Sequence, residues 1–274
     1  MTYCTSKHTP SCVFSTQFPC VFTIPIYCLR HVLINSNYYE LLNVIKYRMI
    51  FKQLFDQKSY TYTYLISSGK GREALIIDPV IENVDEYINI LTELDLKLVK
   101  VIDTHIHADH VTGAGTLKNK TNCSTLMGEN TPAETVEMKV KDGENIKLDQ
   151  LNLKSIYTPG HTSDSYSFLM DNFLFTGDTL LINGTGRTDF QNGNSKDAYN
   201  SLFKKLLTLP DDTIVYPGHD YNGKTKSTIS NEKKYNPRLQ VKSAEEYAEI
   251  MENLNLKKPD EIDSNISSNL KLGI

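Results

Sequence analysis

The sequence predicts an α/β domain with a layered β-sheet, and three observations support that prediction. From Phe51 onward, short apolar runs typical of strands alternate with stretches whose apolar residues recur at helical spacing. No segment repeats at a fixed period, which argues against a solenoid or a propeller. Histidine and aspartate residues follow directly after several predicted strands, which is typical of a functional site at one edge of a sheet.

The first predicted elements form a hairpin. Residues 62–68, YTYLISS, and residues 74–77, ALII, are strand-like runs separated by Gly69-Lys70-Gly71. Glycines at the connection suit a tight turn between antiparallel strands. We therefore expect these two strands to pair with each other.

A helix and an interior strand follow the hairpin. Residues 84–94 have apolar side chains at helical spacing after Asn83, a residue type that caps helices. Residues 98–102, LVKVI, are almost continuously apolar, which predicts a strand in the interior of the sheet. The remaining predicted strands are residues 151–157, 166–170, 173–175 and 213–216, and the remaining predicted helices are residues 198–207 and 244–254.

Composition excludes several classes of function. The chain has 274 residues, of which 39% are hydrophobic and 23% charged, as in an ordinary globular protein. Its 29 basic and 33 acidic residues give a net charge of −4, which argues against a nucleic-acid-binding surface. No uninterrupted apolar run approaches the length that spans a bilayer. We therefore expect neither nucleic acid nor membrane as a partner.

Residues 1–48 differ from the rest of the chain in charge and cysteine content. They hold four basic residues, one acidic residue and four of the five cysteines, so the body retains only Cys123. A body with one cysteine is not a disulfide scaffold, which favours an intracellular, cytoplasmic location. We interpret residues 1–48 as an N-terminal extension with Met49 as the working start. The alternative is a transit segment, because the stretch is rich in Ser and Thr and poor in acids, and it would direct the chain to the mitochondrial matrix.

Residues 49–274 contain the candidate metal ligands, which lie in four short segments after predicted strands. The segments are THIHADH (104–110), TPGHT (158–162), FTGDT (175–179) and YPGHD (216–220). The first packs three imidazoles and a carboxylate into six residues, and these groups are ligands for zinc, iron or manganese. Gly160 and Gly218 would let the backbone turn tightly just before His161 and His219. The sequence therefore predicts a metal site.

Together the four segments resemble the metallo-β-lactamase superfamily. The resemblance runs from about residue 49 to residue 272. It implies an αββα sandwich in a single domain, residues 49–274, with the metal in a cleft at one edge of the two sheets. The same scaffold carries hydrolases, nucleases and oxygenases, so this level of resemblance implies no particular reaction.

A finer resemblance is to the persulfide dioxygenase (sulfur dioxygenase) family. The segments that carry it are TGDTLLINGTGRTDFQ (176–191), YPGHDYNGKTKSTISNEKKYNPRL (216–239), QLFDQKSYTYTYLI near the start and MENLNLKKPDEID near the end. The resemblance implies an enzyme with one non-haem Fe(II) per chain. It also implies oxidation of glutathione persulfide with O2 and water to sulfite and glutathione, a step of sulfide catabolism.

Carried over by motif position, the resemblance implies that His105, His161 and Asp178 hold the iron. It associates the glutathionyl substrate with Arg187 in GRTDFQ, Tyr221 in GHDY and Arg238 in NPRL. Two histidines and one carboxylate leave open positions on iron for substrate and O2, and arginine suits the two carboxylates of glutathione. Two segments depart from the family pattern, at Thr185 and at NISSNL (265–270), and neither removes a ligand.

The runner-up function is a two-zinc hydrolase. His107, Asp109, His110 and His219 are all present, so they are either outer neighbours of the iron or a vestigial second metal site. A hydroxyacylglutathione hydrolase (glyoxalase II-like) would use Zn(2+) with Asp178 as a bridging ligand. The short stretch after His219 leaves little room for the extra helical domain of such enzymes. A non-catalytic metal-binding module is disfavoured by the complete ligand set, and a homodimer is left open.

Overall fold

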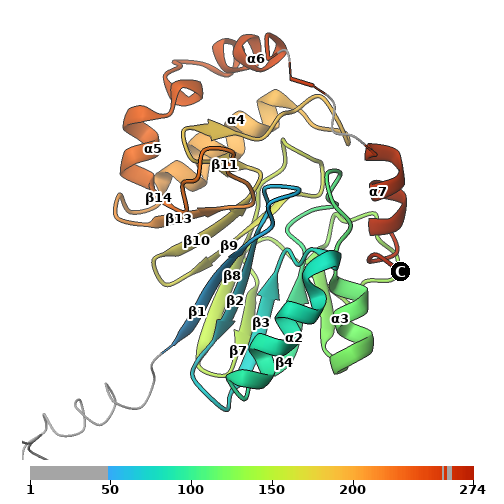
Figure 1. Cartoon of the computed structure of the whole chain (residues 1–274). Coiled ribbons are helices and arrows are strands. Elements are labelled where there is room, and N and C mark those ends of the chain that lie inside the picture. Colours follow the sequence, from blue (N-terminus) through green and yellow to red (C-terminus); the bar gives the residue numbers. More distant parts are fainter. Residues whose placement is uncertain (1–48, 255, 258–260) are drawn as a thin grey trace, which may run out of the picture. The chain divides into compact units, whose positions relative to one another are not determined.

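The computed structural model describes residues 49–254, 256, 257 and 261–274, and its two large sheets have six strands each (Figure 1). The first sheet has the order β1-β2-β3-β4-β5-β6, antiparallel at β1–β3 and parallel from β3 to β6. Its strands are Ile50–Phe55, Tyr62–Ser67, Glu73–Ile77, Lys97–Ile102, Ser124–Gly128 and Met138–Val140.

The second sheet has the order β14-β13-β10-β9-β8-β7, and only its β10–β13 pair is parallel. From β7 to β10 its strands are Asn145–Leu148, Leu151–Tyr157, Tyr166–Met170 and Phe173–Gly177. β13 is Ile214–Pro217 and β14 is Ser227–Thr228. A separate two-stranded ribbon is formed by β11, Leu180–Leu181, and β12, Gly184–Thr185.

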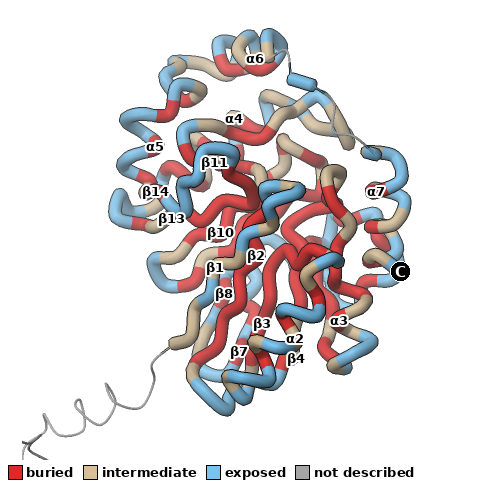
Figure 2. Tube along the Cα trace, viewed as in Figure 1, coloured by how far each residue is buried: buried red, intermediate tan, exposed pale blue. Residues whose placement is uncertain are grey.

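The apolar core lies between the two sheets. Alternate residues of the first sheet, such as Tyr64 and Ile77, point toward Phe168 and Phe175 of the second, and all four are at most 1% exposed. Figure 2 shows the strands as the most continuously buried part of the chain. Because side chains alternate across a strand, each sheet also has an apolar outer face that needs covering.

Helices cover both outer faces. On the first sheet, α2 and α3 bury Tyr87 and Leu117, and on the second, α4 and α6 bury Leu202 and Tyr247 (Figure 1). The helices are α2 Val84–Glu93, α3 Ala114–Thr121, α4 Ser195–Lys204, α5 Ile229–Tyr235, α6 Ala244–Glu252 and α7 Ile262–Asn269, with 3-10 turns η1 Ile81–Asn83, η2 Leu206–Thr208 and η3 Pro237–Leu239. The layers are therefore αββα, which confirms the predicted fold class.

The expected elements are present with small shifts, and one expected detail is wrong. The hairpin of β2 and β3 and the interior position of β4 are confirmed. Asn83 precedes α2 but makes no side-chain cap. Its amide instead donates to Oδ1 of Asp56 at 3.1 Å, so a tertiary contact replaces the local one. None of the described helices has the length and apolar character needed to cross a bilayer.

Backbone hydrogen bonds connect the two sheets at one edge. The amide of Tyr62, where β2 begins, donates to the carbonyl of Gly218 beyond β13 at 2.7 Å. In the opposite direction, the amide of Tyr166 in β9 donates to the carbonyl of Thr104 beyond β4 at 2.9 Å. The hydroxyl of Tyr64 adds a third bond, to the carbonyl of Pro217 at 2.5 Å. The segments that carry the candidate ligands are thus held together where the strands end.

We expect a chain that begins at Met49 to fold and to retain its metal. Residues 1–48 lie outside the described residues, and the described core is complete from Met49 onward, where Met49 itself packs against it. The melting temperature and metal content of this shortened chain should match those of the full chain. An insoluble or metal-free product would show that residues 1–48 are integral to the domain.

Candidate metal centre

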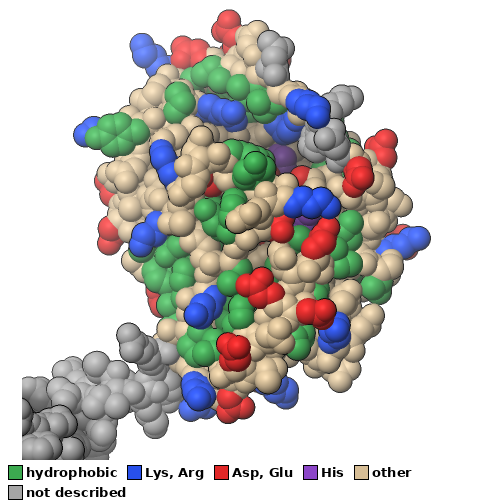
Figure 3. All heavy atoms as spheres, viewed as in Figure 1, with side chains coloured by type: hydrophobic (Ala, Val, Ile, Leu, Met, Phe, Trp, Pro, Cys, Tyr) green, Lys and Arg blue, Asp and Glu red, His purple; other side chains and the backbone are tan. Residues whose placement is uncertain are grey.

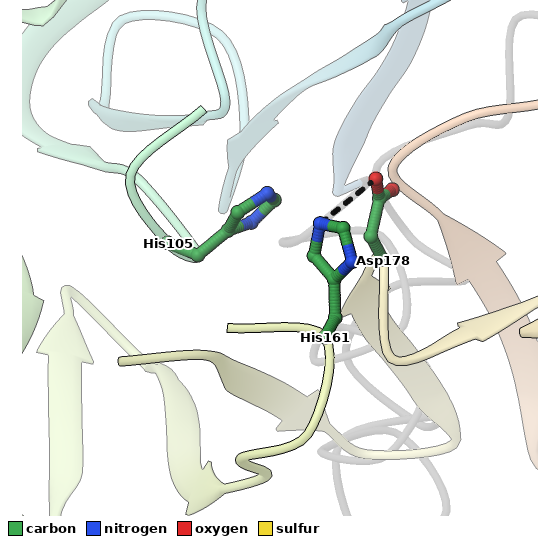
Figure 4. A group of neighbouring side chains, drawn as sticks. All are labelled: His105, His161 and Asp178. Carbon is green, nitrogen blue, oxygen red and sulfur yellow. Dashed lines mark ion pairs between the residues drawn. The ribbon is translucent and has the colours of Figure 1, made fainter. Parts of the chain in front are cut away.

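Three side chains converge at the edge where the two sheets are connected. His105 follows β4 of the first sheet, whereas His161 follows β8 and Asp178 follows β10 of the second. Figure 4 shows the two imidazoles and the carboxylate pointing toward one another from these separate segments. One ligand atom of each lies within 4.8 Å of the others, close enough to hold one ion. The predicted trio is therefore assembled by residues far apart in sequence.

Hydrogen bonds orient the two imidazoles. Nδ1 of His161 lies 2.8 Å from the carbonyl oxygen of Arg187. Because a carbonyl only accepts, Nδ1 carries the proton and the lone pair of Nε2 faces Asp178, whose Oδ2 lies 3.6 Å away. His105 has Nδ1 at 3.0 Å from the hydroxyl of Thr104. Partners of this kind fix the tautomer and the ring plane of a metal-binding histidine.

The electrostatics favour the protonation states that metal binding requires. Burial, helped by the nearby His107 and His161, lowers the pKa of His105 well below its usual range. Burial opposes ionisation of Asp178, but His219, His161 and His105 together hold its pKa below the usual range. A neutral imidazole and an ionised carboxylate are the forms that coordinate a cation, so the residues fit a metal ion.

His219 lies between two carboxylates rather than within the trio. Its Nδ1 is 2.6 Å from Oδ1 of Asp178, and its Nε2 is 2.7 Å from Oδ2 of Asp109. Although burial disfavours the charged ring, these two carboxylates raise the pKa of His219 well above its usual range. Each ring nitrogen thus lies within hydrogen-bond distance of a carboxylate oxygen. The ring fixes the orientation of Asp178 and connects it to the loop that carries Asp109.

The other two histidines of the segment THIHADH, His107 and His110, contact carboxylates outside the trio. Nε2 of His107 lies 3.2 Å from Oδ1 of Asp78, and Nδ1 of His110 lies 3.1 Å from Oδ2 of Asp109. The second nitrogen of each ring, Nδ1 of His107 and Nε2 of His110, is buried without a hydrogen-bond partner among the described residues. Ligand atoms of His107, Asp109 and His110 also lie within 4.8 Å of one another.

Glycines allow the ligand segments to approach closely. Gly177, before Asp178, has φ +48°, and a Cβ there would lie 2.5 Å from the hydroxyl of Thr104. Gly160 has φ +143°, as its predicted tight turn requires. Gly218 also lies at a bend, but without a positive φ, so the backbone conformation there does not itself require glycine. A Cβ at Gly218 would lie 2.7 Å from Oδ1 of Asp178, so close approach to the ligand explains this glycine.

Two members of the trio, His161 and Asp178, line a cavity of about 990 Å³, whereas His105 is buried behind its lining. In the space-filling view, histidine side chains are visible inside a hollow with Lys and Arg side chains along its border (Figure 3). The three residues that the resemblance associates with substrate, Arg187, Tyr221 and Arg238, all line this cavity. Tyr221 is 63% exposed at the mouth, and its ring lies parallel to that of His219 with centroids 6.1 Å apart.

The two arginines already have partners within the protein. Nε and Nη2 of Arg187 donate to the two oxygens of Asp189 at 2.7 and 2.8 Å. Its Nη1 donates at 2.8 Å to the carbonyl of Lys257, in the segment between α6 and α7. Nη1 of Arg238 donates to the carbonyl of Thr185, and no other guanidinium hydrogen bond of Arg238 is formed among the described residues. Arg238 thus keeps more N–H groups for a ligand than Arg187 does.

Sequence reasoning missed two buried aspartates that support the site. Asp78 is 1% exposed and accepts from the amide and the hydroxyl of Thr104, at 2.7 and 2.9 Å, which positions the residue before His105. It follows β3 just as Asp178 follows β10, so the strand-end pattern could have found it. Asp164 accepts from the amide of Ile106 at 3.1 Å, and no local pattern singles it out.

Comparison with known proteins agrees with the fold and the site. The sequence matches the metallo-beta-lactamase superfamily over residues 57–137 and 135–219. It is 40% identical to "Persulfide dioxygenase ETHE1, mitochondrial" of Mus musculus and of Homo sapiens, over 82% of this chain and 89% of theirs. A hydroxyacylglutathione hydrolase of Dictyostelium discoideum is 35% identical over 58% of this chain and 62% of its own.

A solved structure is similar along the whole domain. The crystal structure of ETHE1 from Myxococcus xanthus superimposes with a TM-score of 0.80 at 49% sequence identity, covering 82% of this chain and 100% of that one. Sequence and structure therefore agree on both levels of the resemblance. The chain belongs to the metallo-β-lactamase superfamily and, within it, to the persulfide dioxygenase family.

Proposed function

We propose that this chain is a persulfide dioxygenase that oxidises glutathione persulfide with O2 and water to sulfite and glutathione. The observation that carries the proposal is the meeting of His105, His161 and Asp178 at the wall of a cavity large enough for a tripeptide-sized substrate, with His161 and Asp178 in its lining. Relatives 40% identical over 82% of the chain are named for this activity. The hydroxyacylglutathione hydrolase of Dictyostelium discoideum matches a smaller part of the chain, 58%.

The resident metal we propose is one Fe(II) per chain, held by His105, His161 and Asp178. Two imidazoles and one carboxylate form the ligand set of non-haem iron oxygenases and leave coordination positions open. When bound, the iron would supply the binding and activation of O2 that no amino-acid side chain provides. The chain supplies orientation, because the Arg187 carbonyl holds the ring of His161 and His219 holds the carboxylate of Asp178.

The reaction balances without a further reductant. The outer sulfur of the persulfide gains three oxygen atoms, two from O2 and one from water, and is oxidised to sulfite. The S–S bond breaks, glutathione leaves as the thiol, and two protons are released. The cavity therefore has to admit water together with the substrate, and its border of polar side chains, such as Lys58, Asn183 and Asn222, is consistent with that.

For the glutathionyl part of the substrate we propose contacts with Arg187, Tyr221 and Arg238. The carboxylates of glutathione suit a guanidinium, since two parallel N–H···O bonds are stronger and more directional than a bond to a point charge. Arg238 has N–H groups available for such a pair. Arg187 is held by Asp189 and donates to the carbonyls of Leu256 and Lys257, so it also positions these two residues of the cavity lining.

A two-zinc hydroxyacylglutathione hydrolase is the second candidate, and one observation favours it. The unpaired nitrogens of His107 and His110, close to Asp109, are free to ligate a second ion. Against it, both nitrogens of His219 are engaged by carboxylates, one of them on Asp178. That arrangement gives His219 a role in holding Asp178 without a second metal.

The names of two relatives support a cellular location for this chain. Those of Mus musculus and Homo sapiens carry the word mitochondrial in their names. This supports the interpretation of residues 1–48 as a transit segment, with the mitochondrial matrix as the location, over the cytoplasmic expectation that an upstream extension implies.

Oxygen uptake tests the proposed activity directly. Protein purified without oxygen and loaded with Fe(II) should consume one O2 per glutathione persulfide and release one sulfite and one glutathione, as the balance requires. An acylglutathione thioester should not be hydrolysed by the same preparation. Thioester hydrolysis without persulfide-dependent O2 uptake would establish the hydrolase instead.

Metal content of two variants tests the assignment of ligands. Asp178→Ala should lose iron and activity together, because it removes one of three protein ligands. His219→Ala should keep most of the iron and lose about 10–100-fold in turnover, as expected for a partner of a ligand. The matched control is Asp212→Ala, since Asp212 is exposed, precedes β13 and does not line the cavity. If His219→Ala strips as much iron as Asp178→Ala, the assignment to a single three-ligand site is wrong.

Steady-state kinetics of Arg238→Lys test the substrate contact. The KM for glutathione persulfide should rise on the order of tenfold, because lysine cannot form the two-bond pair with a carboxylate. Iron content should hold. A small alkyl persulfide without carboxylates serves as the control substrate, and its KM should not change. Equal losses with both substrates would assign Arg238 to the packing around Thr185 instead.

A further inference from the structure

The C-terminal helix α7 contacts the histidine-bearing loop through a buried amide. Asn269 is 1% exposed, and its Oδ1 accepts from the backbone amide of Thr112 at 2.8 Å. Its Nδ2 donates to the carbonyls of His107 and His110, both at 2.8 Å. One side chain thus satisfies three backbone groups of the loop 107–112.

These backbone groups depend on Asn269. The carbonyls of His107 and His110 receive no backbone hydrogen bond from the described residues, since the loop belongs to no strand or helix. Leaving buried carbonyls without donors costs roughly 1–3 kcal/mol each. A second amide, that of Asn265 one turn earlier in α7, donates to the carbonyl of Ala108 at 3.1 Å.

Only a carboxamide side chain at position 269 can both accept from the Thr112 amide and donate to the two carbonyls. A carboxamide offers acceptor and donor sites at one point, whereas a carboxylate only accepts and an apolar side chain does neither. α7 is itself fixed in place, because Ile266 and Leu270 pack against the apolar cluster under α2 and α3. The carbonyl of Leu272 adds a bond from the amide of Gly115 at 2.9 Å. A firmly held helix therefore sets the position of the loop.

The loop leads directly to a metal ligand. It carries Asp109, whose Oδ2 is 2.7 Å from Nε2 of His219, and Nδ1 of that ring is 2.6 Å from Oδ1 of Asp178. A displacement of the loop backbone is therefore transmitted through two short hydrogen bonds to the carboxylate of the trio. Asn269 lies at the start of this connection and does not line the cavity.

We propose that Asn269, in the C-terminal helix α7, is a positioning residue for the metal centre. Its carboxamide holds the loop 107–112 so that Asp109 and His219 keep Asp178 in its ligand orientation. A test of this proposal by turnover rests on the proposed function, whereas tests by iron content and by amide hydrogen exchange do not.

The test compares Asn269→Asp with Ser267→Asp, both as full chains. Asn269→Asp keeps an acceptor for the Thr112 amide but places a carboxylate oxygen against the carbonyls of His107 and His110. Ser267→Asp adds the same charge to an exposed position of the same helix. We expect Asn269→Asp, like His219→Ala, to keep most of the iron and to lower kcat by about 10–100-fold, with KM unchanged because the cavity lining is intact. Ser267→Asp should match the parent.

A spectroscopic readout separates positioning from simple destabilisation. The electron paramagnetic resonance spectrum of the nitric oxide adduct of the Fe(II) protein reports on ligand geometry. It should change in Asn269→Asp and not in Ser267→Asp. If Asn269→Asp lowers only the melting temperature, while the spectrum, iron affinity and kcat stay those of the parent, the positioning role is overturned. Absence of persulfide-dependent O2 uptake in the parent would count against the proposed function alone.

Hydrogen exchange on the parent protein makes the proposal testable even if Asn269→Asp does not fold. The amide of Thr112, held by Asn269, should exchange only with opening of the core, like the amides of β4. Exchange at Thr112 as fast as that of an exposed loop amide would show that the contact does not hold the loop, and would overturn the proposal.

Discussion

The candidate metal centre depends on how the two sheets are aligned, because its predicted ligands come from both. His105 follows a strand of the first sheet, and His161 and Asp178 follow strands of the second. The apolar core sets the distance between the sheets, while the bonds from Tyr166 to Thr104 and from Tyr62 to Gly218 fix their alignment beside the ligands. Each such bond contributes only about 1 kcal/mol net, so their importance lies in alignment rather than in stability.

Each predicted ligand is in turn held by a partner outside the trio. The Arg187 carbonyl orients His161, His219 orients Asp178, and Asp78 holds the residue before His105. The partners come from four different segments, so the geometry of the centre is distributed over most of the domain. This explains why glycine is needed at Gly177 and Gly218, where any Cβ would displace a ligand or its neighbour.

The sequence predicted the layers and the location of the site, for a physical reason. Strand-like runs followed by His or Asp mark the edge of a sheet whichever order the strands take, so His105 and Asp178 could be placed together in advance. Which histidines form the trio came only from the resemblance, since spacing does not distinguish His105 from His107. The contacts of Arg187 with backbone carbonyls and those of the Asn269 amide were not predictable, because a side-chain bond to a backbone carbonyl leaves no residue pattern and the partners lie far away in sequence.

The central claim is a single iron between two histidines and one aspartate, and anomalous diffraction tests it most directly. Crystals of protein purified without oxygen should show one anomalous peak at the iron edge, within coordinating distance of His105, His161 and Asp178. No second peak should lie near Asp109, His110 and His219. Two peaks at the zinc edge, bridged by Asp178, would contradict the account.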